Sequence, residues 1–274
     1  MIEAVLAAVL AFFTPAPADA GWMVVVGATT TTTTTTTLPA YPVYDSAACG
    51  CYQTPGDGGP WTFSHTTGNH ATGRKLVLGI WAYDPGDNAS CIATASFTKT
   101  YNGDAITGDA GDDYRETTTA SPDLCGSFTY LDDPDIGTYD ISITGPDDSG
   151  GDSPLVMVAC AVSIYNAEPG APPVASDTGA SNSGISFSFA NETDTTNDLH
   201  VVMVGRSVAD TAVTWDATPN PTTERASIDC TTNTDLQGRV GTGVVVTGGT
   251  SAPNGTMGTS ELVTWYGAFS PYTP

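Results

Sequence analysis

Histidine, cysteine and carboxylate side chains carry much of protein chemistry, and this sequence offers all three without a recognisable catalytic spacing. The histidines His65, His70 and His200 are scattered, and no C-x-x-C pair accompanies them as in a zinc site. A serine nucleophile would be expected in a G-x-S-x-G turn, which the sequence lacks. Acidic residues are so common that no carboxylate pair is favoured for glycoside hydrolysis. We therefore expect no catalytic residue, no cofactor and no bound metal.

Acidic residues gather in turns, for example at Asp112-Asp113 and between Asp147 and Asp152. Asp133-x-Asp135-x-Gly137 resembles the beginning of a calcium loop, but the glutamate that completes such a loop is missing. Runs of charge are usually solvated. We interpret these turns as soluble surface, and a single Ca²⁺ site stays open as an alternative.

The charge balance excludes two classes of partner. The 274 residues include 7 Lys+Arg and 30 Asp+Glu, which gives a formal net charge of −23. Such a chain repels nucleic-acid phosphates and has no basic face for anionic lipids. Charged residues are only 14% of the chain, and abundant Thr, Ser, Gly and Pro take their place. We expect no nucleic acid, no membrane in the mature form, and an extracellular location.

Six cysteines support an oxidising compartment, because their number is even and the chain is acidic and threonine-rich. Six cysteines allow 15 complete pairings. Cys49 and Cys51 are too close in sequence to bridge each other comfortably. Cys91 and Cys125 both lie in turn-rich stretches, and we predict that they pair.

Several residues are candidates for glycosylation. Nine consecutive threonines, 29–37, are typical of an O-glycosylated spacer, although a plain linker or a strand is also consistent with them. Three N-x-S/T sequons lie in stretches that read as turns. The candidates are Thr29, Thr31, Thr33, Thr35, Thr37, Asn88, Asn191 and Asn254.

The elements begin with an apolar arm, residues 1–45, which holds the two runs 5–13 and 22–26 ahead of the threonines. Neither run alternates with polar residues. A strand that is apolar on both faces belongs between two layers, and the arm itself contains no such layers. We predict that the arm pairs with another copy of the chain through Val5, Leu6, Val9, Leu10, Phe12, Phe13, Trp22, Val24 and Val26.

The first apolar run also has the shape of a secretory signal. It is followed by Ala18-Asp19-Ala20, a small-residue cleavage site ahead of Gly21, although Glu3 stands where a basic residue is usual. If the signal is removed, only Trp22–Val26 remains for the pairing role. If it is retained, the run is too short to span a bilayer, which needs about 20 apolar residues.

The remainder predicts an all-β fold of two antiparallel β-sandwich or jelly-roll domains, over 46–169 and 170–274. Short strand-like runs, such as 75–83, 155–165 and 199–204, alternate with Gly- and Pro-rich turns. Gly-Ala-Pro-Pro at 170–173 marks the boundary.

Four segments carry a resemblance: Trp61-Thr-Phe-Ser-His-Thr-Thr-Gly68, Leu76-Val-Leu-Gly-Ile80, Tyr101-Asn-Gly103 and Ala161-Val-Ser-Ile-Tyr165. Over roughly 60–170 the chain resembles a family of environmental bacterial and phage surface β-sandwich proteins, largely of unknown function. An apolar arm ahead of two sandwiches also resembles protomers of extracellular filaments that assemble by N-terminal donor-strand insertion. The resemblance implies no catalytic residue.

The prediction is therefore a non-enzymatic structural subunit of an extracellular helical filament. Its partners would be other copies of itself, in a homopolymer, together with covalent glycans. One alternative is a secreted or phage-tail glycan-binding adhesin, which would stack sugars on Trp81, Tyr83, Trp265 and Tyr266. A secreted glycan-degrading enzyme is the other alternative.

Overall fold

Antiparallel β-strands form the whole of the described fold, so the all-β sandwich prediction is confirmed. The computed structural model describes residues 41–54, 60–70, 72–84, 97–116, 123–144, 155–173, 175–194, 197–207, 213–216, 222–230, 236–245 and 249–273. The strands are β1 Val43–Thr54, β2 Trp61–Thr67, β3 Lys75–Asp84, β4 Thr98–Tyr101, β5 Asp104–Ala105, β6 Gly108–Glu116, β7 Asp123–Asp132, β8 Gly137–Thr144, β9 Leu155–Tyr165, β10 Ala175–Asp194, β11 Leu199–Arg206, β12 Thr214–Trp215, β13 Thr223–Cys230, β14 Leu236–Val244 and β15 Gly249–Phe269.

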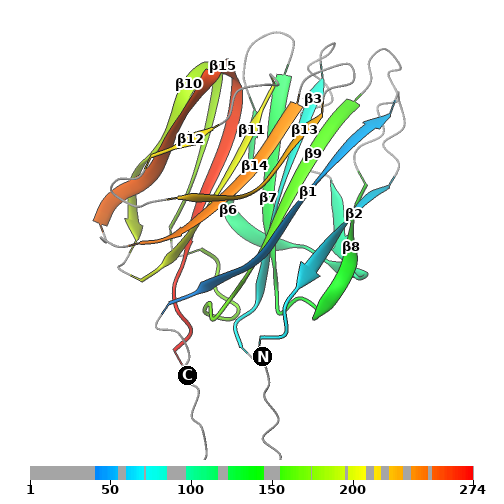
Figure 1. Ribbon diagram of the computed structural model, residues 1–274, viewed down its shortest axis with the longest axis vertical. Helices are drawn as coiled ribbons and strands as arrows, with labels where there is room; N and C mark the ends of the chain where they lie inside the picture. The colour runs from blue at the N-terminus through cyan, green and yellow to red at the C-terminus, as the bar shows by residue number, and fades with distance from the viewer. Residues whose placement is uncertain are drawn as a thin grey trace, which may run out of the picture. The chain divides into compact units, whose positions relative to one another are not determined.

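These strands build three sheets (Figure 1). The central sheet has the order β1-β9-β3-β7-β6, and the small sheet has the order β2-β8-β4-β5. The C-terminal sheet has the order β10-β15-β11-β14-β13, and β12 pairs with β15. Strands before residue 170 thus form the central and small sheets, and strands after it form the C-terminal sheet.

The central sheet is buried on both faces, because β3 and β9 are apolar at nearly every position. Leu76, Leu78 and Ile80 of β3 pack against the small sheet. Val77 and Trp81, on the opposite face of β3, join a cluster with strands of the C-terminal sheet. The contacts group residues Leu38–Pro274 as one compact unit, so the segments 46–169 and 170–274 share a core.

Trp81 shows how closely these two sheets approach. Its side chain is fully buried, and its indole Nε1 donates to the carbonyl oxygen of Val263 at 3.1 Å. A Cβ on Gly205 would lie 2.0 Å from the Trp81 ring, and one on Gly238 would lie 3.3 Å from it. Gly205 therefore leaves the space that the indole occupies, and Gly238 leaves space for Val158 next to it.

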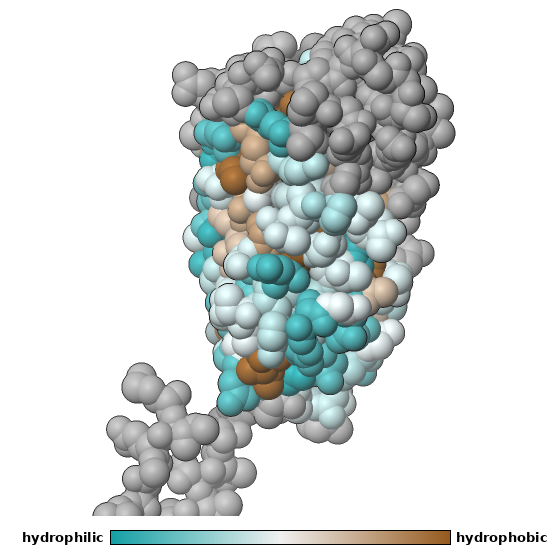
Figure 2. Space-filling view, turned by 90° about the vertical axis from the view of Figure 1, so that its right-hand side faces the viewer, coloured by the Kyte–Doolittle hydropathy of each residue, from teal (hydrophilic) through white to brown (hydrophobic). Residues whose placement is uncertain are grey.

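The outer face of the C-terminal sheet carries its own buried cluster, which includes Phe187, Val202, Val204 and Tyr266. The long strands β10 and β15 supply much of it. The large exposed hydrophobic residues of the described part of the chain are Tyr41 and Ile136. Figure 2 shows a face coloured mainly as hydrophilic or neutral, with hydrophobic residues in small separate groups.

Two disulfides fasten β1. Cys49 bonds to Cys160, its direct partner in β9, with 4.1 Å between the Cα atoms. Cys51 bonds to Cys230 at the end of β13, and this bond joins the edge of the central sheet to the edge of the C-terminal sheet. Disulfides of this kind indicate an oxidising environment. Cys125 is also disulfide-bonded, but Cys91, its predicted partner, lies outside the described residues.

Candidate functional site

Asn166 forms hydrogen bonds at the end of the compact unit Leu38–Pro274, called the module below, where the N- and C-terminal segments of this unit meet (Figure 1). Its side-chain amide donates to the carbonyl oxygen of Tyr41 at 3.0 Å, and its main-chain N–H donates to that of Thr72 at 3.1 Å. Its own carbonyl accepts from the N–H of Tyr272 at 2.8 Å. Asn166 has a φ of 60°, a left-handed conformation that asparagine tolerates better than most residues. One buried residue thus joins three chain segments to the end of β9.

The C-terminal segment is held along the same end. Ala167 forms an isolated antiparallel bridge with Pro271, and the N–H of Glu168 donates to the carbonyl of Ser270 at 3.0 Å. The Ser270 hydroxyl donates to Asp198 at 2.9 Å. The C-terminal segment is thus fixed by hydrogen bonds to the segment that follows β9, where Asn166 also binds Tyr41.

A cavity of about 230 Å³ lies beside this junction. The guanidinium of Arg74 is fixed there, because it donates to the carbonyls of His70 at 2.6 Å and Pro134 at 3.2 Å and pairs with Asp133. The volume suits one or two side chains rather than an extended ligand. Its lining consists of Thr72, Gly73, Arg74, Asp132, Asp133, Pro169 and Tyr272.

Most of the predicted functional residues belong to segments that the structure does not describe. The nine apolar arm residues Val5 to Val26, the threonine candidates Thr29 to Thr37, and Asn88 all lie outside the described residues. The contacts divide the chain into two units, Met1–Thr37 and Leu38–Pro274. Strand β1 begins at Val43, so it includes the last three residues that the sequence assigned to the arm.

Two predicted glycosylation sites lie in strands, which corrects their placement in turns. Asn191 belongs to β10, and Asn254 belongs to β15, where it pairs with Ser188. The amide oxygen of Asn254 is buried. The turn prediction was wrong because the polar composition around both residues concealed strands of 20 and 21 residues.

The aromatic residues assigned to sugar stacking are also elsewhere than predicted. Trp81, Trp265 and Tyr266 have no exposed surface, and Tyr83 is 8% exposed. They lie on strands that are covered on both faces, so alternation along the strand places none of them at the surface. They stabilise the core and offer no platform for a glycan.

His65 and Ser163 form the arrangement most similar to a catalytic pair. The two are buried, and Nε2 of His65 lies 2.7 Å from Oγ of Ser163. Within the described part of the chain, Nδ1 of His65 has no hydrogen-bond partner, so the acid that orients a catalytic imidazole is missing there. Ser163 has no exposed surface. The pair therefore joins β2 to β9 as part of the packing.

A second polar contact connects the start of β1 to the segment after β2. Asp45 accepts hydrogen bonds from the N–H of Gly68 at 2.6 Å and from Nε2 of His70 at 3.1 Å. The His70 ring stacks on Tyr165, with 3.6 Å between centroids.

The described residues contain no group of three or more His, Cys, Asp or Glu placed to hold a metal ion. They also contain no helix with the length and hydrophobicity to cross a bilayer.

Two buried histidines make stability depend on pH. Burial lowers the pKa of His65 to about 4, against a smaller opposing effect of Asp45, and burial alone lowers the pKa of His200 to about 4. The unfolded chain binds these protons near pH 6.5 and the folded chain does not. The two histidines therefore do not reduce the free energy of unfolding above about pH 6.5, and this free energy decreases as the pH drops toward 4. Each buried histidine should lower it by ~2 kcal/mol at pH 5.

Chemical denaturation between pH 7 and pH 5 measures this loss. In His200→Gln the decrease over that range should be about half of the native one, whatever the absolute stability of the variant. An identical pH dependence in the native chain and the variant would contradict the assignment to buried histidines.

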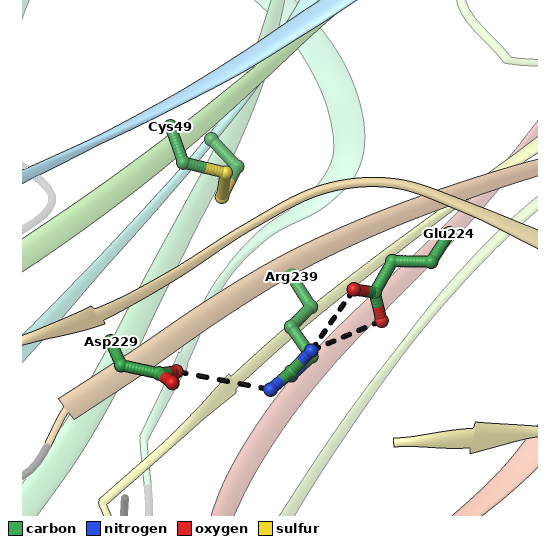
Figure 3. Close-up of a disulfide and its surroundings, with 5 residues drawn as sticks. Cys49, Glu224, Asp229 and Arg239 are labelled. Carbon is green, nitrogen blue, oxygen red and sulfur yellow. Dashed lines mark hydrogen bonds and ion pairs between the residues drawn. A yellow bond between two sulfur atoms is a disulfide. The ribbon is translucent and has the colours of Figure 1, made fainter. Parts of the chain in front are cut away.

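Sequence reasoning missed a polar cluster on the outer face of the C-terminal sheet, shown in part in Figure 3. Nη1 of Arg239 donates to both oxygens of Glu224 at 3.0 and 3.1 Å, and Nη2 lies 3.8 Å from Asp229. Arg206 lies beside it and is 1% exposed. The available signal was an arginine at the end of the apolar run 199–205, in a chain with only 7 Lys and Arg residues.

Comparison of the chain with protein-family models, with curated proteins and with solved structures finds no match.

Proposed function

We propose that the chain is a secreted structural subunit that polymerises head to tail into an extracellular filament, by insertion of its apolar N-terminal segment into a neighbouring copy. The observation that carries the proposal is the division of the chain into Met1–Thr37 and Leu38–Pro274. Among the described residues, the three buried clusters of the second unit are composed of residues between Tyr44 and Phe269. The apolar runs at 5–13 and 22–26 thus belong to a different unit from these cores.

The sheets offer places where an added strand could pair. Among the described strands, β1 and β6, β10 and β13, and β2 and β5 end their sheets and have a sheet neighbour on one side only. Edge strands present main-chain groups for a further strand, and pockets for alternate side chains give specificity. A contact that adds a strand from one copy to the edge of the next does not close on itself and generates a filament.

The other features are consistent with a subunit exposed to the environment. Disulfides fasten β1 to two other strands, and Asn166 binds the main chain at Tyr41, ahead of β1. The net charge of −23 keeps such a surface soluble. Glycosylation of the threonine run remains a prediction. Assembly by donor-strand insertion, which the resemblance to filament protomers implies, also remains one.

A competition experiment on the full chain tests the proposal. The purified chain should form fibres in negative-stain electron microscopy. An excess of a synthetic peptide that covers residues 4–27 should occupy the acceptor edge and shorten or abolish them. The matched control is the same peptide with Leu10→Asp and Phe12→Asp, which should have no effect. A chain that stays monomeric under all conditions would overturn the proposal.

A further inference from the structure

The side chain of Arg206 is held in place by its neighbour, and no described residue forms an ion pair with it. Arg206 is the last residue of β11, and its Cα partner in β14 is Gln237. Its Nε donates to the side-chain oxygen of Gln237 at 2.5 Å, and Nε of Arg239 approaches the same oxygen at 3.4 Å. One amide oxygen thus fixes two guanidinium groups.

Three buried nitrogen donors remain unused at this place. Within the described part of the chain, Nη1 and Nη2 of Arg206 and Nε2 of Gln237 have no hydrogen-bond partner. Both residues are 1% exposed. A buried donor without a partner is costly, and a buried charge without one is more so. The three donors belong to two side chains that are hydrogen-bonded to each other, and all three require an acceptor.

The neighbouring carboxylates do not meet this need, because they are directed at Arg239 (Figure 3). Glu224 binds Arg239 through both oxygens and also accepts from the indole N–H of Trp215 at 3.2 Å. Asp229 lies 3.8 Å from Arg239. Burial lowers the pKa of Arg206, the charge of Arg239 lowers it further, and Asp229 opposes this. Among the described residues, no carboxylate therefore forms a direct ion pair with Arg206.

From this geometry we propose that Arg206 and Gln237 form a binding site for a small oxyanion, with Nη1, Nη2 and Nε2 as its donors. The planar fork of a guanidinium matches two oxygens of a carboxylate, sulfate or phosphate. Arg239 adds positive potential but stays bound to Glu224. The cluster reaches solvent by Asp229, whose side chain is 44% exposed. The oxyanion is either free in solution or the carboxylate of an acidic side chain on a second copy.

Sulfate is a suitable probe, and thermal unfolding of the full chain is the measurement. Sulfate stabilises proteins in general by exclusion from their surface, so the site is recognised by an additional rise in Tm that saturates at millimolar concentration. Arg206→Gln should remove the saturable rise and keep the general one. Arg225→Gln is the matched control, because Arg225 is an exposed arginine of the adjacent strand β13, stacked on Tyr44. It should behave as the native chain does.

A second variant keeps the test decisive if Arg206→Gln does not fold. Gln237→Glu replaces the unused amide nitrogen by a carboxylate oxygen at nearly the same volume. It should raise the Tm without sulfate and abolish the saturable response. A response to sulfate that is the same in the native chain, Arg206→Gln and Gln237→Glu would overturn the proposal, and the rise would be an adventitious ion effect only.

Sedimentation distinguishes the two sources of the oxyanion. If a carboxylate of a second copy occupies the site, self-association of the native chain should weaken with sulfate and with Arg206→Gln. If the oxyanion is free, association should be the same in both, and dialysis against labelled sulfate should show one equivalent bound per chain. Absence of both effects would overturn the proposal.

Discussion

Replacing Leu10 and Phe12 by aspartate is expected to leave the chain folded and monomeric. Each side chain would contribute about 1.5–3 kcal/mol when buried in a neighbouring copy, and a buried aspartate adds a penalty of similar size or larger. The double change should therefore weaken each junction by ~6 kcal/mol or more, which is over four orders of magnitude in affinity. Sedimentation and negative-stain microscopy of the native chain and the variant measure this loss.

The control is Thr33→Asp with Thr35→Asp, which places the same two charges in the threonine run. That variant should polymerise as the native chain does, because the run acts as a connector. Fibres formed by the Leu10 and Phe12 variant would show that these side chains are not inserted. Intact mass should be determined as well, because a mature chain that begins at Gly21 transfers the role to Trp22, Val24 and Val26.

Removal of the disulfide between Cys51 and Cys230 is expected to cost about 4 kcal/mol in free energy of unfolding. The bond closes a loop with a sequence separation of 179 residues, and long loops give the largest loss of unfolded-state entropy. Guanidinium denaturation of a Cys51→Ala, Cys230→Ala chain measures the effect. A loss below about 1 kcal/mol would contradict the prediction. It would mean that packing alone holds the edge strands β1 and β13 together.

The bond between Cys49 and Cys160 provides a matched comparison. It spans 111 residues, so its removal should reduce stability by a similar amount. It joins neighbours that eleven residue pairs already hold in register, from Val43–Tyr165 to Thr54–Leu155. Hydrogen exchange should therefore increase more in β13 when Cys51 and Cys230 are replaced, because that bond is a covalent link from β13 to the central sheet and the bond between Cys49 and Cys160 does not involve β13.

Strands with strong local patterns could be predicted from the sequence. The runs 75–83, 155–165 and 199–204 are apolar on both faces, and they became β3, β9 and β11, the strands with a covered surface on each side. β1 and β6 have small or acidic residues instead of an apolar pattern, and their pairing with β9 and β7 fixes them. Local propensity does not reveal a strand whose stability comes from its neighbour.

The polar site residues depended on long-range pairing in the same way. Arg206 and Gln237 are 31 residues apart and meet because β11 and β14 align them in register. The same applies to His65 and Ser163, which are 98 residues apart. A sequence reading finds motifs of fixed short spacing, and these contacts have none.

The position of Trp81 determines when this protein can reach its native state. Its indole N–H bonds to a carbonyl 182 residues later, at Val263, and Gly205 and Gly238 complete its surroundings. During synthesis the indole has no native environment until β15, which carries Val263, has emerged. Cooperative collapse around Trp81 must therefore wait for β15, and a topology of such high contact order folds slowly. The bond between Cys51 and Cys230, which are 179 residues apart in sequence, also cannot form until β13 has emerged.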